Sequence, residues 1–231
     1  MFEIMWYNDC RYIRFGGIIL ETVVYISRHA EGLMKTIEQY NSKDSFQVKN
    51  EKNPLSVNGE EKARKLSECD ELKDIDVIYS SHYVRTMATA KYIANKNNLK
   101  LNVDSRFGER VFGINDFSEL PSDFFYRQLS DWNYKICNGE SLLEVCKRMN
   151  EALEELLNLY KGKRVVIVSH GTSLSAMLAK WCDIKWNEAN KLVEIYFKDK
   201  LVFDGNWNAP ELFKLIFDNE FNLKDIKNIK Y

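Results

Sequence analysis

The chain has 231 residues, of which 45% are hydrophobic and 29% are charged. This composition supports a packed core and a polar surface, and it excludes a disordered or collagen-like chain. The 33 basic and 34 acidic side chains leave a net charge of -1, so no global field attracts nucleic acid or an anionic membrane. Any anion must therefore be bound by a local cluster of cations.

The spacing of the cysteines and the length of the apolar runs indicate in which cellular compartment the protein is expected. The 5 cysteines are scattered and form no C-x-x-C pair, which favours reduced thiols in a cytosolic protein over disulfides or a zinc site. No apolar run approaches the roughly 18 residues that a membrane span needs. We therefore expect a cytoplasmic protein without a nucleic-acid or membrane partner.

Residues 1–20 form an N-terminal extension ahead of the first predicted strand, and its status is open. Asp9, Arg11 and Arg14 lie among its apolar residues and no small-residue cleavage site follows, unlike a secretory signal. The extension is either an additional ordered segment or a stretch upstream of a true start at Leu20. In both cases residues 21–231 are predicted to form one domain.

Strands and helices alternate in the first half of this domain. A β-branched and aromatic run predicts a buried strand over residues 22–27. A polar stretch over 32–55 follows, with a short helix near 33–40. The next predicted elements are a helix over 57–69, a strand over 76–80, a helix over 83–97 and a strand over 100–103.

The second half continues this alternation after an irregular, aromatic-rich stretch over 104–138 that contains a helix over 122–131. The spacing Ser141-x-x-Glu144 predicts a capping box, which opens a helix that runs to residue 160. The remaining elements are a strand over 164–168, a helix over 172–182, a hairpin of 191–197 with 200–203, and a last helix over 210–218. The pattern predicts an α/β fold of three layers, in which a mainly parallel open sheet is flanked by helices and followed by a C-terminal hairpin.

Basic and imidazole side chains follow the predicted strand ends. Arg28 and His29 follow the first strand, His170 follows the strand over 164–168, and Arg85 begins the helix behind the second strand. The carboxyl ends of parallel strands meet at one rim, where a following helix can also point free N–H groups at an anion. Singly, such a histidine is more often a core residue and such an arginine a surface charge. Burying both arginines unpaired would cost several kcal/mol each, which an anionic ligand would offset.

Five segments resemble, in order, the motifs of the histidine phosphatase superfamily, the phosphoglycerate-mutase-like group. They are TVVYISRHAE at 22–31, IYSSHYVRTMATA at 78–90, FGERVFG at 107–113, Gly139-Glu140-Ser141 with Arg148, and VVIVSHG at 165–171. The chain departs from the group at Ala30, where glycine is usual, and at His82, where proline is common. The segment after Glu31 also lacks the usual polar residues, which puts phosphate contacts from that loop in doubt.

The resemblance implies a metal-independent phosphomonoester phosphatase with no cofactor, acting through a phosphohistidine on His29. Glu109 would be the general acid and base, with Asp116 as a reserve candidate. Arg28, Arg85 and His170 would bind the phosphoryl group, and His170 would also take part in catalysis. The expected partner is a small phosphorylated substrate, and a homodimer is left open.

Two alternatives to the phosphatase stay open. A phosphoglycerate mutase-type phosphoryl transferase usually has a longer insertion between the acidic residue and the second histidine, so the short interval from Glu109 to His170 favours a phosphatase. A non-catalytic phosphate-binding or regulatory relative would have lost one of the four basic and imidazole residues. The aromatic residues of 104–138 either pack in the core or form an apolar lid over the pocket. Trp207 is expected in the core.

Overall fold

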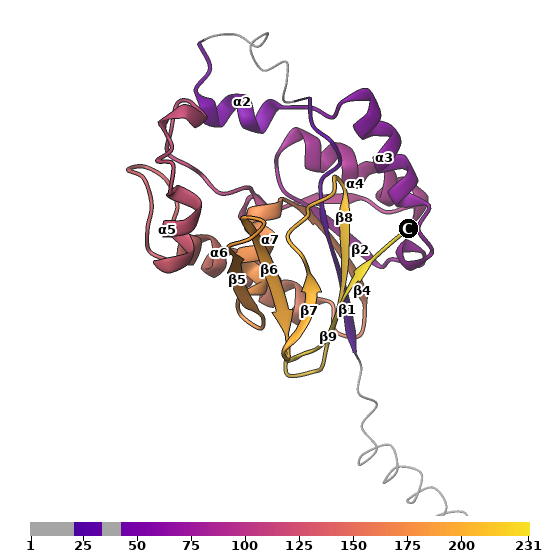
Figure 1. Ribbon diagram of the computed structural model, residues 1–231. Coiled ribbons are helices and arrows are strands. Elements are labelled where there is room, and N and C mark those ends of the chain that lie inside the picture. Colours follow the sequence, from indigo (N-terminus) through magenta and orange to yellow (C-terminus); the bar gives the residue numbers. More distant parts are fainter. Residues whose placement is uncertain (1–20, 34–42) are drawn as a thin grey trace, which may run out of the picture.

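A six-stranded sheet organises the protein (Figure 1), whose computed structural model describes residues 21–33 and 43–231. The predicted extension 1–20 and all but the first residue of the helix predicted near 33–40 lie outside the described residues. The strand order is β3-β2-β4-β1-β8-β9. The strands are β1 (Thr22–Arg28), β2 (Val77–Ser80), β3 (Leu101–Val103), β4 (Arg164–Ser169), β8 (Glu211–Phe217) and β9 (Leu223–Ile229).

The sheet is mainly parallel, as the sequence predicts. Strands β1, β2, β3 and β4 pair in parallel, whereas β8 and β9 are antiparallel to their neighbours. Parallel neighbours need crossover connections, and the helices between these strands supply them. The carboxyl ends of β1, β2 and β4 consequently lie at one rim of the sheet.

Helices cover both faces of the sheet and complete three layers (Figure 1). In β4, Val165 and Ile167 pack toward α6 (Leu142–Leu159) and α7 (Gly171–Leu178), while Val166 and Val168 pack toward α3 (Val57–Ser67) and α4 (Val84–Lys96). Successive side chains of a strand point to opposite faces, so a strand that is apolar at every position needs a cover on both sides. The α/β fold and its layers are confirmed.

The capping box and the hairpin are also confirmed. Ser141 Oγ accepts from the Glu144 N–H at 3.1 Å, and the Glu144 carboxylate accepts from the Ser141 N–H at 2.8 Å. The predicted hairpin forms β6 (Leu192–Phe197) and β7 (Lys200–Phe203) of a second, three-stranded sheet. Its third strand, β5 (Asp183–Asn187), was not predicted. Helix α7 ends at Leu178, before the predicted end at residue 182. The remaining helices are α2 (Phe46–Lys52), which was not predicted, and α5 (Phe124–Ser130), which was.

The helix predicted over 210–218 is wrong, because this segment forms strand β8 between β1 and β9. Phe213 and Leu215 pack in the core beneath α6 and α7, and Leu212 packs in the core on the other face. An internal strand is buried on both faces, so its residues show no clean two-residue alternation that would separate it from a buried helix. Hydrogen bonds to two neighbouring strands decide its conformation.

Three further properties concern only the described ranges. No helix in them is long and apolar enough to cross a membrane. Cys69, Cys137, Cys146 and Cys182 form no disulfide with one another. No group of three or more His, Cys, Asp or Glu side chains there could hold a metal ion.

Helix α3 packs closely against the backbone that follows His29, and Gly59 makes this approach possible. A Cβ atom at Gly59 would lie 2.0 Å from the carbonyl oxygen of Glu31, which also accepts from the Ser56 N–H at 2.9 Å. Alanine usually stabilises a helix by up to about 1 kcal/mol relative to glycine. At Gly59 the added methyl group would clash with backbone atoms of Glu31, so the cost of overpacking exceeds this gain and the substitution lowers the stability of the protein.

We expect Gly59→Ala to lower the free energy of unfolding by about 1–3 kcal/mol, measured by urea denaturation. Val57→Ala in the same helix is the control, because Val57 is 91% exposed and should change stability by less than about 0.5 kcal/mol. A Gly59→Ala protein as stable as the parent would show that the helix is free to move away from Glu31.

Candidate active site

Three strand ends bring the two predicted histidines together. His29 follows β1, Ser81 follows β2 and His170 follows β4. The His29 N–H donates to the Ser169 carbonyl at 3.0 Å, and the Ser81 N–H donates to the Val168 carbonyl at 3.0 Å, so the sheet ladder continues to the site. The ring centroids of His29 and His170 are 5.2 Å apart, with an angle of 65° between the ring planes.

The Arg85 side chain connects the two imidazoles. From the first turn of α4, its Nε donates to His29 Nε2 at 3.0 Å and its Nη2 donates to His170 Nδ1 at 3.2 Å. Its Nη1 donates to the Asn50 carbonyl at 2.6 Å. Because a guanidinium only donates, both ring nitrogens must act as acceptors.

These contacts assign one tautomer to each histidine. His29 Nδ1–H donates to the Ala30 carbonyl at 2.7 Å, which leaves the lone pair on Nε2. His170 Nε2–H donates to Ser81 Oγ at 2.9 Å. Ala30 is not among the described residues with positive φ, so the alanine in place of the usual glycine imposes no backbone strain.

Both imidazoles are neutral in this site. Burial, followed by the charge of Arg85, holds the pKa values of His29 and His170 well below the usual range. Arg28 adds a smaller repulsion that also lowers the pKa of His29. An unprotonated Nε2 on a buried ring is the form of histidine that can act as a nucleophile.

The guanidinium groups of Arg28 and Arg85 lie in the site without carboxylate partners. Arg28 Nη1 donates to the Trp207 and Asn208 carbonyls at 3.0 and 3.3 Å, and Arg85 is 4% exposed. In the described part of the chain, neither forms an ion pair with a carboxylate. Burial lowers the pKa of both guanidinium groups, and the negative charge of the nearby Glu109 offsets only part of this effect. The site is therefore suited to an anion.

Glu109 lies beside this cluster and is held from two helices. Its Oε1 accepts from the Arg110 N–H at 2.9 Å and from Ser173 Oγ, in α7, at 3.1 Å. Arg148, in α6, pairs with Glu140 at 2.6 Å and donates to the Glu109 carbonyl at 3.2 Å. With Oε1 occupied, Oε2 is the oxygen available to a reacting group.

Asp116, the reserve candidate, does not join this cluster. Its carboxylate accepts from the Ser118 N–H at 2.8 Å and caps the short 3₁₀ helix Phe117–Glu119. It is also absent from the lining of the cavity that contains Arg28 and Glu109. Its role in the structure is that of a cap.

Several neighbours of the cluster were not predicted. Tyr83 packs against His170, with ring centroids 4.5 Å apart. Asn53 is fully buried beside Gly32, and neither amide atom has a hydrogen-bond partner in the described chain. Ser173, which donates to Glu109, is a third neighbour that was not predicted. Of the three, only Ser173 has a signal in the sequence, because it follows His170 by about one helical turn. The positions of Tyr83 and Asn53 depend on tertiary packing, which the local sequence pattern does not predict.

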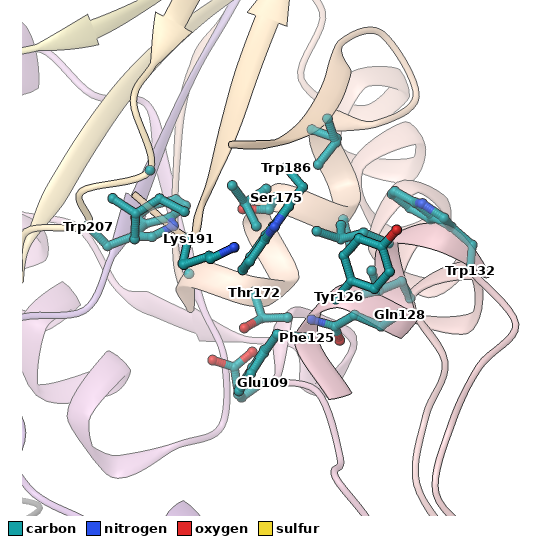
Figure 2. A pocket seen from close by; sticks show the side chains of 18 of the residues that line it. Glu109, Phe125, Tyr126, Gln128, Trp132, Thr172, Ser175, Trp186, Lys191 and Trp207 are labelled. Atoms are coloured by element: carbon teal, nitrogen blue, oxygen red, sulfur yellow. The ribbon is translucent and has the colours of Figure 1, made fainter. Parts of the chain in front are cut away.

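A cavity of about 710 Å³ opens beside Glu109 and Arg28. Figure 2 shows Glu109 and Thr172 at one end and Trp132 at another, with Tyr126 and Trp186 between them. Some aromatic residues of 104–138 pack in the core and others lie at the pocket, so both expected locations occur. The rings of Phe107, Phe112 and Phe124 are buried in the core, whereas Phe125, Tyr126 and Trp132 line the cavity. Trp207, expected in the core, packs against it and also lines the cavity.

Comparison with known proteins agrees with this geometry. The profile of the Histidine phosphatase superfamily (branch 1) matches residues 24–194. The chain belongs to the histidine phosphatase superfamily. Four of the five motif segments that resemble this family lie inside the matched range, and the first, at 22–31, begins two residues before it; the range includes His29, His170, Arg28, Arg85 and Glu109.

Relatives within the superfamily have different names. The "Probable phosphoglycerate mutase GpmB" of Salmonella arizonae is 31% identical over 163 residues, covering 68% of this chain and 73% of the relative. A mycobacterial glucosyl-3-phosphoglycerate phosphatase structure with VO3 has a TM-score of 0.65 at 20% identity, covering 90% of this chain and 98% of that chain. A mutant phosphoserine phosphatase from Entamoeba histolytica, in complex with phosphoserine, has a TM-score of 0.61 at 19% identity, covering 89% and 96%. The solved structures establish the shared fold, and the family supports phosphatase or phosphoryl-transfer chemistry.

The two buried histidines make stability depend on pH. An unfolded histidine binds a proton near pH 6.5, whereas His29 and His170 have lowered pKa values and stay neutral in the folded protein. Below that pH the unfolded state binds more protons, so the free energy of unfolding falls as the pH falls. We expect a loss of up to about 2 kcal/mol per histidine between about pH 7 and pH 5 in urea denaturation.

The matched control is the double variant His29→Asn, His170→Asn. Ordinary carboxylates titrate below this window, so the variant should have a flatter profile between about pH 7 and pH 5. Parallel profiles for parent and variant would contradict the assignment of two neutral buried imidazoles.

Proposed function

We propose that the protein is a metal-independent phosphomonoester phosphatase that acts through a phosphohistidine on His29. The observation that carries the proposal is Arg85, a buried cation that joins two neutral imidazoles and has no carboxylate partner. A phosphoryl group supplies the missing negative charge and accepts several hydrogen bonds at once. Phosphoryl transfer needs mainly positioning and charge stabilisation, which this cluster offers without a metal ion.

In the first step, Arg85 Nε transfers its hydrogen bond from His29 Nε2 to a phosphoryl oxygen, and the freed lone pair of Nε2 forms a bond to phosphorus. The bond between phosphorus and the ester oxygen breaks, and protonated Glu109 transfers its proton from Oε2 to the departing alcohol. Arg28 and Arg85 hold the phosphoryl oxygens. The Nδ1–H of His29 keeps its hydrogen bond to the Ala30 carbonyl, which orients the ring throughout.

In the second step, the Glu109 carboxylate removes a proton from water, whose oxygen attacks phosphorus. The P–N bond breaks, the electron pair returns to His29, and inorganic phosphate is released. His170 can donate to a phosphoryl oxygen from Nδ1 in its other tautomer, in which the proton has moved from Nε2 to Nδ1, Arg85 Nη2 has turned from Nδ1 to the phosphoryl group, and the Ser81 hydroxyl donates to Nε2. Ser81 Oγ can do so while it still accepts from the Tyr83 N–H at 3.2 Å.

A phosphoglycerate mutase-type phosphoryl transferase is the second candidate, because a probable mutase is 31% identical to this chain. Incubation with 3-phosphoglycerate separates the two: a phosphatase releases phosphate, whereas a mutase forms the isomer. A non-catalytic phosphate-binding relative is less well supported, since Arg28, His29, Arg85 and His170 are all retained. The boundaries 21–231, a homodimer and a cytoplasmic location stay predictions.

His29→Ala should lower phosphate release at least about 10⁴-fold, because the nucleophile is lost. Incubation of the parent enzyme with a ³²P-labelled ester, followed by an alkaline quench in detergent, should reveal a label that later acid treatment removes and that the variant lacks. Activity of the parent should be unchanged by EDTA. A His29→Ala enzyme that keeps its turnover, or loss of parental activity in EDTA, would count against this mechanism.

Glu109→Gln should slow alkyl phosphates far more than aryl phosphates with acidic leaving groups. The amide cannot donate a carboxylic proton, and only a poor leaving group depends on that proton, so we expect a difference of about 10²-fold or more in kcat/KM. Asp116→Asn is the matched control and should leave both rates close to the parental values. Equal slowing of both ester classes by Glu109→Gln would remove Glu109 from the acid role.

A further inference from the structure

The cavity beside Glu109 has several aromatic side chains in its wall. Five line it, from α5 and the chain just after it, from the small sheet, and from the segment before β8: Phe125, Tyr126, Trp132, Trp186 and Trp207. The rings of Phe125 and Tyr126 are 47% and 52% exposed. Exposed aromatic surface gathered around one cavity is typical of a binding site.

The aromatic wall is continuous with the phosphate-binding cluster. The Trp207 carbonyl accepts from Arg28, and its ring lies 3.4 Å from the position that a Cβ atom of Gly171 would occupy, directly after His170. Glu109 lines the same cavity (Figure 2). A phosphoryl group at His29 with its ester oxygen near Glu109 would therefore place the alcohol part of the ester in the cavity.

Beyond Arg28, the cavity offers little to a second anionic group. The other lining residue with a positive charge is Lys191, whose Nζ is paired with the Glu188 carboxylate at 2.6 Å. Gln128, which also lines the cavity, is a neutral amide, and its Oε1 accepts a hydrogen bond from Arg110. A carboxylate or second phosphate on the alcohol would lose its hydration without gaining an unpaired cation.

Resting on the proposed function, we propose that the substrate is the phosphomonoester of a bulky apolar alcohol, either aryl or extended alkyl. Its phosphoryl group binds at His29, and its hydrocarbon body covers the rings of Tyr126 and Trp186. Removal of this apolar surface from water favours binding in proportion to the area covered. Phosphoglycerate, a small polyanion, does not match this wall.

The test compares n-octyl phosphate with glycerol 3-phosphate. Both leaving groups are poorly acidic alcohols, so a difference in kcat/KM reports contacts of the alcohol part and not leaving-group chemistry. We expect octyl phosphate to be favoured at least about 100-fold. Equal values, or a preference for glycerol 3-phosphate, would overturn the apolar specificity while leaving the phosphatase intact. Hydrolysis of neither ester, together with no labelling of His29, would instead overturn the proposed function.

Two variants connect the preference to the wall. Tyr126→Ala and Trp186→Ala should each reduce the octyl-to-glycerol ratio of kcat/KM about tenfold, mainly through KM for octyl phosphate. Tyr196→Ala is the matched control, because Tyr196 belongs to the same small sheet as Trp186 but does not line the cavity; its ratio should stay parental. Ratios unchanged in both cavity variants would contradict the proposal. The half-exposed Tyr126 keeps the test valid if Trp186→Ala fails to fold.

Discussion

The burial of one guanidinium between two imidazoles is the interaction on which the site depends. Arg85 loses its hydration and gains only neutral partners, two ring nitrogens and the Asn50 carbonyl. The same positive charge lowers the pKa of both histidines and keeps His29 Nε2 unprotonated. One buried cation therefore favours both neutral imidazoles and the binding of an anion. In the proposed reaction, the substrate's phosphoryl group is that anion.

This arrangement needs a rigid support, which both faces of the sheet supply. On one face, α4 supplies Arg85 and fixes the chain after His29, because Thr89 Oγ1 accepts from the Ala30 N–H at 3.0 Å. On the other face, α6 and α7 hold the Glu109 segment through Arg148 and Ser173. The proposed nucleophile and the proposed acid are thus positioned by different helices, and the sheet between them sets their separation.

The proposed chemistry and the proposed specificity depend on different side chains. The side chains proposed to bind the phosphoryl group follow strands β1 and β4 or begin α4. The aromatic wall comes from α5 and the chain just after it, the small sheet and the chain before β8. Relatives named as mutases and phosphatases share the fold at 19–31% identity, while their names indicate different substrates. In the proposed function, changes in the wall redirect substrate choice without altering His29.

Short-range patterns in the sequence were enough to determine the parallel strands, most helices and the rim at which both histidines lie. Buried β-branched runs and the Ser141 capping box act over a few residues, so they can be recognised without a tertiary structure. The conformation of β8 was decided by hydrogen bonds to β1 and β9, which are distant in the chain. Contacts across the fold also decided that Phe124 is buried while Phe125 lines the cavity, and that Asn53 lies beside Gly32. Side-chain environment depends on what packs against each residue, and no local periodicity encodes that partner.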